Sequence, residues 1–332
     1  MGGYLVLNFA IVGCGLIGRK RALALQKVAN LTTCYDFDPG KATKFSQDFN
    51  CTISKTYENL LSTENLDAVI IAIHHNKLSE LSRKAILANL NVLIEKPGAL
   101  NYSEFLKTIE TFNLRKNLKI HIGYNHMYHP SIIKSLELVR SGAIGRIMFI
   151  RGSYGHGGRL GYENEWRANK LISGGGELID QGSHLLDLSI AFLGDLELEY
   201  ASTPTYFWNM QVEDNVFLVL KNKNNVISFL HASCTEWKNS FSFEIYGENG
   251  KIKISGLGGS YGVEKLTFYK MNSNMGVPES ESWEYDSEDS SWKIELLDFI
   301  ADIEQRTSET NNIESASKVL RIIEDIYQRN GR

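Results

Sequence analysis

The chain has 332 residues, of which 43% are hydrophobic and 22% charged, and its formal net charge is -4. This ordinary globular composition, with enough length for two domains that each have a core, excludes a disordered chain. The slightly negative charge gives no basic field that would attract nucleic acid or an anionic membrane.

The N-terminal segment MGGYLVLNFAIVG is apolar but lacks the basic start and cleavage site of a signal peptide, so it predicts a first strand. The longest later apolar run, AVIIAI, is too short to span a bilayer. Cys14, Cys34, Cys51 and Cys234 form no C-x-x-C pair and are expected to be small buried residues. These features favour a cytoplasmic protein without a disulfide framework, structural zinc or membrane attachment.

Up to about residue 124, apolar strand segments alternate with helical ones. The expected strands are LNFAIVG, LTTCYDF, TISK, LDAVIIAI, NVLIEK and KIHIGY, with helices near 17–29, 39–49, 76–89 and 101–115 and a short one in YENLLST. Continuously apolar strands separated by helices are typical of a parallel sheet covered on both faces. Residues 1–124 are therefore predicted to form a doubly wound α/β domain.

The segment GCGLIG joins the first strand to the first helix and has the spacing of a dinucleotide-binding loop. Gly13 permits the tight turn, Gly15 lets the backbone approach a pyrophosphate, and Gly18 permits close helix packing. The helix that begins at Leu16 and Ile17 directs its first N–H groups and its positive dipole end at the phosphates. This arrangement predicts a dinucleotide site.

Asp36 stands at the end of the second strand, where this fold carries an acidic residue for the ribose hydroxyls. Its carboxylate would repel the 2′-phosphate of NADP, so NAD is the expected cofactor. The alternative is that Asp36 or Asp38 caps the helix beginning at Pro39, for which Asp38 is better placed.

Glu95 and Lys96 follow the strand NVLI, and the carboxyl ends of such strands are where doubly wound domains bind ligands. Glu95 is therefore a candidate cofactor contact. Lys96 could donate to a substrate hydroxyl or carbonyl oxygen. Alternatively, Lys96 is a solvated lysine before a turn.

Beyond Pro130 the pattern changes to one helix near 130–141, the strand GRIMFIRGSY, a glycine-rich loop and a helix at 183–193. Strand segments then follow one another: VFLVLKN, NVISFLHAS, SFEIYGEN, GKIKISG and EKLTFYK. Residues 125–332 are thus predicted to form a second, α+β domain on one largely antiparallel sheet. The helical tail near 291–305 and 313–328 is expected to pack on that sheet or back on the first domain.

The segment GGGELIDQGSHLLD places Asp180, His184 and Asp187 at helical spacing, so they can share one face. In isolation, Asp180 would more often cap a helix and His184 would pack in the interior. A metal held by all three residues is also possible by spacing.

Taken together, GCGLIG, the Asp of CYDFDP, VLIEKPGALN, YNHMYHP and WRANKLISGGGELIDQGSHLLD resemble the Gfo/Idh/MocA family, named for glucose-fructose oxidoreductase, inositol dehydrogenase and rhizopine catabolism. The resemblance covers nearly the whole chain. It implies an N-terminal Rossmann domain and a C-terminal domain with an open-faced sheet, often used for dimer or tetramer contacts. It also implies a nicotinamide cofactor and a sugar, sugar nucleotide or cyclitol substrate.

By this resemblance, Lys96, Asp180 and His184 converge on the reacting carbon. His184 is the candidate general base, because an imidazole titrates near working pH. Lys96 would hold and polarise the substrate oxygen, and Asp180 would orient the substrate or the histidine. The three glycines before this segment are expected to let the backbone pass close to nicotinamide and substrate. No metal is expected, since hydride transfer needs none.

Other contacts are carried over where the motifs match. Asn125 is a candidate substrate residue; His126 stands where the family commonly has arginine, and it and His129 are candidate substrate contacts. Asn76, after the strand VIIAI, is a candidate cofactor contact, although HHNKLSE departs from the family's turn there. The loop SYGHGGRLGYENEWR offers groups that suit a sugar ring or that only pack: Arg159, Trp166 and Arg167.

Three hypotheses of function follow. The first is an NAD-dependent sugar or cyclitol dehydrogenase or ketoreductase, active as a homodimer or homotetramer. The second keeps the fold and cofactor but oxidises a sugar only transiently, to permit elimination or glycoside cleavage without net redox change. The third is a non-catalytic NAD-sensing protein, which the presence of Lys96 and His184 disfavours.

Overall fold

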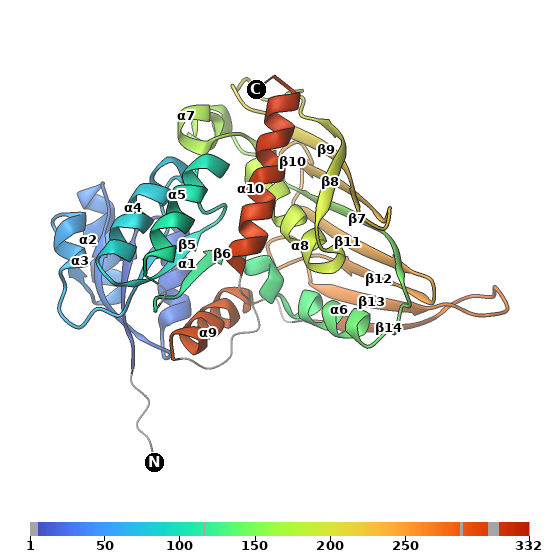
Figure 1. Ribbon diagram of the computed structural model, residues 1–332, viewed down its shortest axis with the longest axis horizontal. Coiled ribbons are helices and arrows are strands. Elements are labelled where there is room, and N and C mark those ends of the chain that lie inside the picture. Colours follow the sequence, from blue (N-terminus) through green and yellow to red (C-terminus); the bar gives the residue numbers. More distant parts are fainter. Residues whose placement is uncertain (1–5, 116, 286–287, 305–311, 332) are drawn as a thin grey trace, which may run out of the picture. The chain divides into compact units, whose positions relative to one another are not determined.

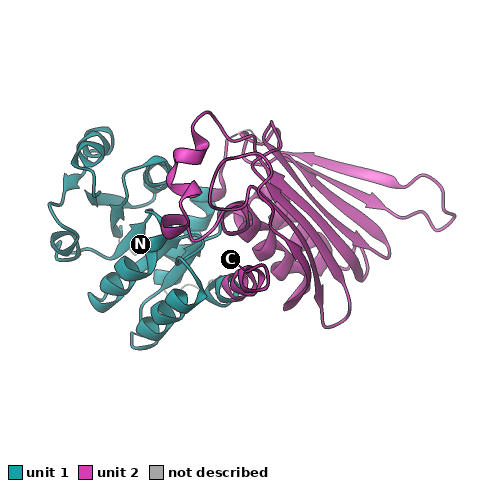
Figure 2. Cartoon of the chain, turned by 90° about the horizontal axis from the view of Figure 1, so that it is seen from above, with its two compact units in different colours: residues 1–124, 292–317 teal, residues 125–291, 318–332 magenta. Residues whose placement is uncertain are grey.

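The computed structural model describes residues 6–115, 117–285, 288–304 and 312–331. The chain forms two compact units, residues 1–124 with 292–317 and residues 125–291 with 318–332 (Figure 2). The sequence division placed all of 125–332 in the second domain. Residues 292–317 instead belong to the first unit, because Leu296 and Phe299 are fully buried in its core.

The first unit contains a sheet of six strands in the order β3-β2-β1-β4-β5-β6. Every neighbouring pair is parallel. The predicted doubly wound parallel sheet is confirmed, with its order reversing beside β1. The strands are β1 Asn8–Val12, β2 Asn30–Tyr35, β3 Thr52–Ile53, β4 Ala68–Ile71, β5 Asn91–Glu95 and β6 Ile120–Gly123.

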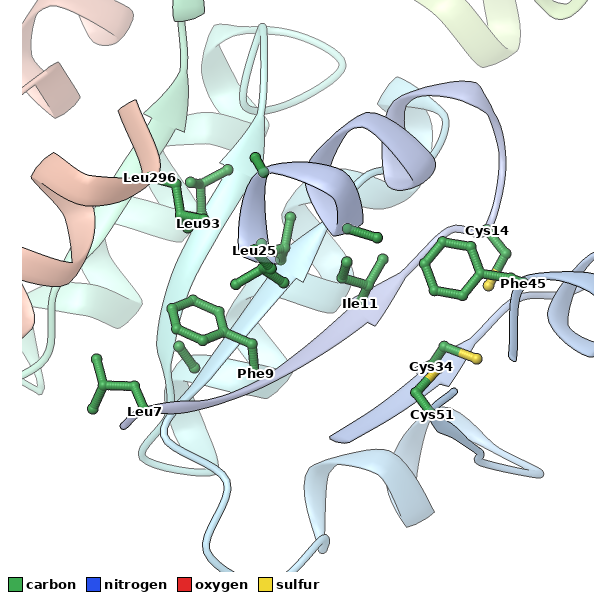
Figure 3. Close-up of a cluster of buried hydrophobic side chains, with 14 of the residues drawn as sticks. Leu7, Phe9, Ile11, Cys14, Leu25, Cys34, Phe45, Cys51, Leu93 and Leu296 are labelled. Carbon is green, nitrogen blue, oxygen red and sulfur yellow. The ribbon is translucent and has the colours of Figure 1, made fainter. Parts of the chain in front are cut away.

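Helices cover this sheet (Figure 1): α1 Leu16–Leu25, α2 Pro39–Phe49, α3 Tyr57–Leu61, α4 His75–Leu87, α5 Tyr102–Asn113 and α9 Ser291–Ile303. One core cluster gathers Phe9 and Ile11 of β1 with Leu25 of α1 and Leu93 of β5 (Figure 3). Three of the cysteines are buried free thiols in the same cluster: Cys14, Cys34 and Cys51. Their packing as small apolar side chains is as expected from the sequence.

The second unit contains an eight-stranded sheet in the order β14-β13-β12-β11-β7-β10-β9-β8. Its pairs are antiparallel except β7 with β10, so the predicted largely antiparallel sheet is confirmed. The strands are β7 Ile147–Gly155, β8 Leu196–Ser202, β9 Asn215–Asn222, β10 Ile227–Ser233, β11 Ser240–Gly247, β12 Gly250–Ser255, β13 Lys265–Lys270 and β14 Glu279–Glu284.

Helices α6 (Pro130–Arg140) and α8 (Ser183–Leu193) pack on the second sheet (Figure 1). Residues 318–329 of α10 (Asn312–Arg329) also belong to this unit. Side chains alternate along the central strands, so Leu218 and Leu230 are buried while Phe229 is exposed on the opposite face. On the exposed face, Phe149 stacks on Tyr246 with ring centroids 4.2 Å apart. Within the described residues, no helix is long and apolar enough to cross a membrane.

A buried charge cluster joins three elements of the first unit. Arg21 of α1 is completely buried, and its guanidinium binds Glu95 at the end of β5 (2.6 Å) and Glu295 of α9 (2.5 Å). The guanidinium also lies over the Trp292 ring, 4.5 Å from its centroid. Burial lowers the pKa of Arg21, but the charges of Glu295 and Glu95 outweigh it and raise the pKa. The arginine is therefore fully charged, and two carboxylates depend on it.

Replacing Arg21 with methionine is expected to destabilise the protein by about 3–5 kcal/mol, because two buried carboxylates lose the cation that pairs with both. Denaturation followed by circular dichroism measures the loss. The matched control is Arg19→Met, two residues earlier in α1, whose pair with Asp48 is partly exposed and is expected to contribute about 0–1 kcal/mol. Equal losses in the two variants would contradict the role assigned to the cluster.

Candidate active site

The glycine loop of the first unit has the geometry that its sequence predicts. Gly13 has φ +96°. A Cβ on Gly13 would lie 2.1 Å from the carbonyl oxygen of Ala72, the residue that follows β4. A Cβ on Gly18 would lie 1.8 Å from the Gly13 oxygen. Gly15 instead faces open space, with no atom within 4 Å of its Cβ position. Two glycines thus permit close packing, and the third leaves the room that a pyrophosphate needs at the start of α1.

Asp36 lies directly beside this loop. One carboxylate oxygen accepts the backbone N–H of Cys14 (2.7 Å), and the other accepts that of Asp38 (2.8 Å). Each oxygen keeps a second lone pair that can accept a ribose hydroxyl. Asp38 is the N-cap of α2 and accepts the backbone N–H of Gly40, as the sequence indicates. The cap of α2 is therefore Asp38, and Asp36 remains the candidate acidic residue for the ribose.

The other strand ends of the first unit carry the remaining cofactor candidates. Lys96 follows β5 and is partly exposed. The carboxylate of Glu95 is directed at Arg21, so its side chain has a structural partner that sequence reasoning did not foresee. Asn76 lies in the first turn of α4, after His74 as N-cap.

In the second unit, Leu178–Gly182 form a π-helical turn that leads directly into α8. The helix predicted at 183–193 is confirmed, but the assumption of regular α-helical spacing from Asp180 to Asp187 was wrong. A π-turn adds a residue to the helix and is frequently found at functional sites. Here it places Asp180 next to Arg167, whose Nε donates to Asp180 Oδ2 over 2.9 Å.

Arg167 connects Asp180 with the loop that precedes α7 (Lys170–Ser173). Burial lowers the pKa of Arg167, but the charge of Asp180 outweighs it and raises the pKa. The same guanidinium lies over Trp166, 4.6 Å from the ring centroid. Arg159 is instead largely exposed and pairs with Glu165 at 2.5 Å. Of the three loop candidates, Arg167 thus binds Asp180, and Trp166 lies against Arg167.

His184 lies buried in the first turn of α8 and stacks on a second buried histidine. The rings of His184 and His126 have centroids 3.7 Å apart and an interplanar angle of 17°. His126 Nε2 is 3.4 Å from the Tyr154 hydroxyl. Positive charge on both rings at this separation would be strongly repulsive. The stack therefore favours a state in which at least one imidazole is neutral.

The two other candidates from YNHMYHP have internal partners. His129 is buried, and its Nδ1 lies 2.8 Å from Glu264 Oε2. Asn125 is also buried and donates from Nδ2 to Ser291 Oγ over 2.9 Å. The His129 ring is therefore held by the protein's own carboxylate.

The glycines before the π-turn permit close packing within the protein. Gly174 ends α7 with φ +82°. A Cβ on Gly175 would lie 1.8 Å from the Tyr327 hydroxyl, and one on Gly176 would lie 2.0 Å from the Glu213 carbonyl oxygen. Their missing side chains thus admit parts of the protein itself, a role that the sequence did not predict.

Glu177 is a buried residue that sequence reasoning missed. Its Oε1 accepts from the Tyr162 hydroxyl (3.1 Å) and lies 3.5 Å from His156 Nε2. Its Oε2 is buried with no hydrogen-bond partner. The sequence signal was a single acidic residue between the glycines and the apolar residues of GGGELI. Among the described residues, no group of three or more His, Cys, Asp or Glu side chains could hold a metal ion.

Comparison with known proteins agrees with these features. A model described as "Oxidoreductase family, NAD-binding Rossmann fold" matches residues 7–124, and one described as "GFO/IDH/MocA C-terminal domain" matches residues 133–253. The molecule is thus an NAD-binding oxidoreductase. The chain belongs to the Gfo/Idh/MocA family, as the resemblance of its motifs predicted.

Two relatives and one structure illustrate the match. An inositol 2-dehydrogenase/D-chiro-inositol 3-dehydrogenase of Lactiplantibacillus plantarum is 22% identical over 91% of this chain and 85% of its own. A 2,7-anhydro-N-acetylneuraminate hydratase of Mediterraneibacter gnavus is 24% identical over 75% of this chain and 67% of its own. Levoglucosan dehydrogenase in complex with NADH and levoglucosan has a TM-score of 0.89 and 19% identity over 98% of each chain. That structure shares the fold.

The pair of Glu177 and His156 gives a prediction about pH. Burial lowers the pKa of His156, but the hydrogen bond and charge of Glu177 outweigh it and raise the pKa above 6.5. The protonated ring therefore stabilises the folded state below the ordinary pKa, and this contribution is lost as pH rises through the raised folded-state pKa. Glu177→Gln should lower the pKa of His156, as measured by NMR on ¹³C-labelled histidines.

His231 is the internal control, because burial lowers its pKa although Glu236 opposes the shift. Its titration should stay unchanged in Glu177→Gln. An unchanged His156 titration in that variant would show that Glu177 does not control this ring.

Proposed function

We propose that the protein is an NAD-dependent dehydrogenase or ketoreductase that acts on a secondary alcohol or ketone of a sugar, sugar nucleotide or cyclitol. The observation that carries the proposal is His184, a buried imidazole stacked on a second imidazole and preceded by the Asp180–Arg167 pair. Such a group suits proton transfer near neutral pH. Relatives named as inositol and levoglucosan dehydrogenases support the substrate class.

The cofactor would be held by the first unit. The glycine loop with the N–H groups of Leu16 and Ile17 would bind the pyrophosphate, and Asp36 would bind the adenosine ribose. Asn76 and the Glu95–Lys96 strand end are proposed to contact the nicotinamide half. When bound, the cofactor supplies the hydride acceptor or donor.

The residues of the chain would handle the proton and the substrate. His184 accepts the hydroxyl proton during oxidation and returns it during reduction. Lys96 donates to the same oxygen and polarises it. Asp180, held by Arg167, binds a neighbouring hydroxyl, and the ring face of Trp166 packs against the sugar. The remaining proposed substrate contacts are Asn125, His126, Arg159 and Arg167.

A second candidate is a reaction without net redox change, in which the substrate is oxidised transiently so that water or a leaving group can be eliminated or added. The observation that favours it is the relative named as a hydratase. A cofactor that copurifies and does not exchange, with no net change in NADH absorbance during turnover, would distinguish it from the first candidate.

We also propose that copies of the chain associate through the exposed face of the second sheet. Phe149 and Phe229 are large apolar side chains exposed there. A second copy seated on that face would remove them from water.

Specificity for NAD is expected to depend on Asp36. Asp36→Ala should weaken NADH binding and bring NADPH binding to within about tenfold of it, because the carboxylate that repels a 2′-phosphate is gone. Calorimetric titration of the two cofactors measures this. Asp38→Ala is the control, since that side chain caps α2; it should leave the preference intact. Tight NADPH binding by the unaltered protein would refute the role of Asp36.

The catalytic assignment is tested by a screen of sugars, cyclitols and sugar nucleotides for formation or consumption of NADH, repeated in variants. His184→Ala and Lys96→Ala should each lower turnover by about 10² or more while NADH still binds, because acid-base groups act in the transition state. His231→Ala, on strand β10, is the control and should retain turnover. Unchanged turnover in both active-site variants would exclude this mechanism.

A further inference from the structure

A cleft of about 650 Å³ lies in the second unit and is not explained by the roles assigned above. Ligand sites commonly have volumes of roughly 300–1,000 Å³. Two aromatic residues line it, buried Phe241 and partly buried Tyr261. The other lining residues are Glu236, Lys238, Asn239, Ser240, Ser260 and Gly262.

The aromatic lining connects the cleft to His184 through one further ring. Tyr261 and Phe241 both pack on Tyr154, with centroids 4.9 and 5.5 Å away. Tyr154 in turn lies edge-on to His184 at 6.1 Å. The Tyr261 hydroxyl accepts from Gln181 Nε2 over 3.2 Å, and Gln181 is the neighbour of Asp180 in the π-turn. One buried ring, that of Tyr154, therefore lies between the aromatic lining of the cleft and His184.

The polar lining suits an uncharged polyol. Hydroxyl groups of Ser240 and Ser260 can both donate and accept. Asn239 Nδ2 donates to the Ser260 carbonyl oxygen over 2.9 Å and so holds two parts of the lining together. Lys238 and Glu236 contribute one charge of each sign, so the cleft has no surplus positive charge. A diphosphate would call for such a surplus, commonly from arginine.

An exposed aromatic pair stands at the rim. Trp237, between two lining residues, is 67% exposed, and Phe207 meets it edge-to-face at 4.7 Å while itself 58% exposed. Trp237 also has φ +57°, a conformation that a bulky residue rarely adopts. Its backbone is held in place, because Glu236 donates its N–H to the His156 oxygen and a Cβ on Gly157 would lie 2.9 Å from Trp237 Cα.

Backbone strain of this kind persists where the surroundings enforce it, and it concentrates at ligand clamps. The indole offers an apolar face for the C–H groups of a sugar ring and an N–H for its hydroxyls. We propose that this cleft binds a second glycosyl unit, joined to the ring that reacts, so that the substrate is a disaccharide or longer glycoside. This inference rests on the proposed function and narrows its substrate class.

The test compares methyl glycosides of glucose, galactose and mannose with disaccharides that contain the same rings, using protein supplied with NAD. The expected result is that kcat/KM for one disaccharide exceeds that for its methyl glycoside by about tenfold or more, which corresponds to one well-buried side-chain contact. Trp237→Ala and Lys238→Met should each reduce this ratio. Tyr200→Ala removes a comparably exposed aromatic residue on β8 and should leave the ratio unchanged.

Calorimetric titration of the same sugars into NADH-loaded protein separates this inference from the proposed function, because it needs no turnover. If a disaccharide binds more tightly than its methyl glycoside and Trp237→Ala abolishes the difference, the result supports a glycosyl site in the cleft even if no sugar is oxidised. If sugars are oxidised but the ratio of kcat/KM between disaccharide and methyl glycoside is near one, the proposal for the cleft is wrong and the proposed function stands. A further outcome is that the protein prefers sugar nucleotides. If Lys238→Met removes that preference and Trp237→Ala does not, the cleft is a diphosphate site and the proposal of a glycosyl site is wrong.

Discussion

The first unit depends on the buried cation at Arg21. Its guanidinium binds Glu95 and Glu295, whose side chains are 8% and 0% exposed. Moving any one of these side chains would leave a buried charge without its partner. Helices α1 and α9 and the end of β5 therefore stabilise one another. The glycine loop begins α1, and Lys96 follows Glu95. The cluster thus fixes the spacing between the proposed phosphate site and the proposed catalytic lysine, which is the preorganisation that catalysis requires.

In the second unit, a buried carboxylate holds the segment before the π-turn in place. Glu213 Oε1 accepts hydrogen bonds from the N–H groups of Gly176 and Leu178 and from the Tyr327 hydroxyl. Because those partners converge on one oxygen, the glycine segment is held in place. A fully satisfied buried polar network is rigid. The chain therefore enters α8 in a fixed orientation, with Asp180 and then His184 presented by a segment that has little freedom to move.

The sequence predicted most of the features that depend on neighbours along the chain. Strand and helix alternation up to residue 124, the glycine loop, Asp38 as a cap and the helix at 183–193 all follow from local pattern. Strands β8 and β14 escaped notice because they are the edge strands, and the mostly exposed residues of β14 lack the alternation that a half-buried strand shows.

What the sequence could not supply were contacts between distant residues. Glu295 stands 274 positions from Arg21, and Tyr327 and Glu213 lie far from the glycines that admit them. No periodicity reports such pairs. The π-turn was missed for a related reason, since Asp180, His184 and Asp187 fit an α-helical face equally well. The residues that contact the π-helical segment and the glycines before it, Arg167 and Glu213, lie outside that segment.

The stack of His126 on His184 sets the surroundings of the imidazole that we propose as the base. The resemblance of the segment YNHMYHP implies arginine where this chain has His126. An arginine would place a permanent positive charge against the proposed base. Imidazolium is also a planar cation, but unlike guanidinium an imidazole can be neutral near physiological pH. The rings are 3.7 Å apart, so the charge on His126 acts directly on His184. The proposed base therefore lies beside a side chain that can be neutral, whereas an arginine there would impose a constant charge.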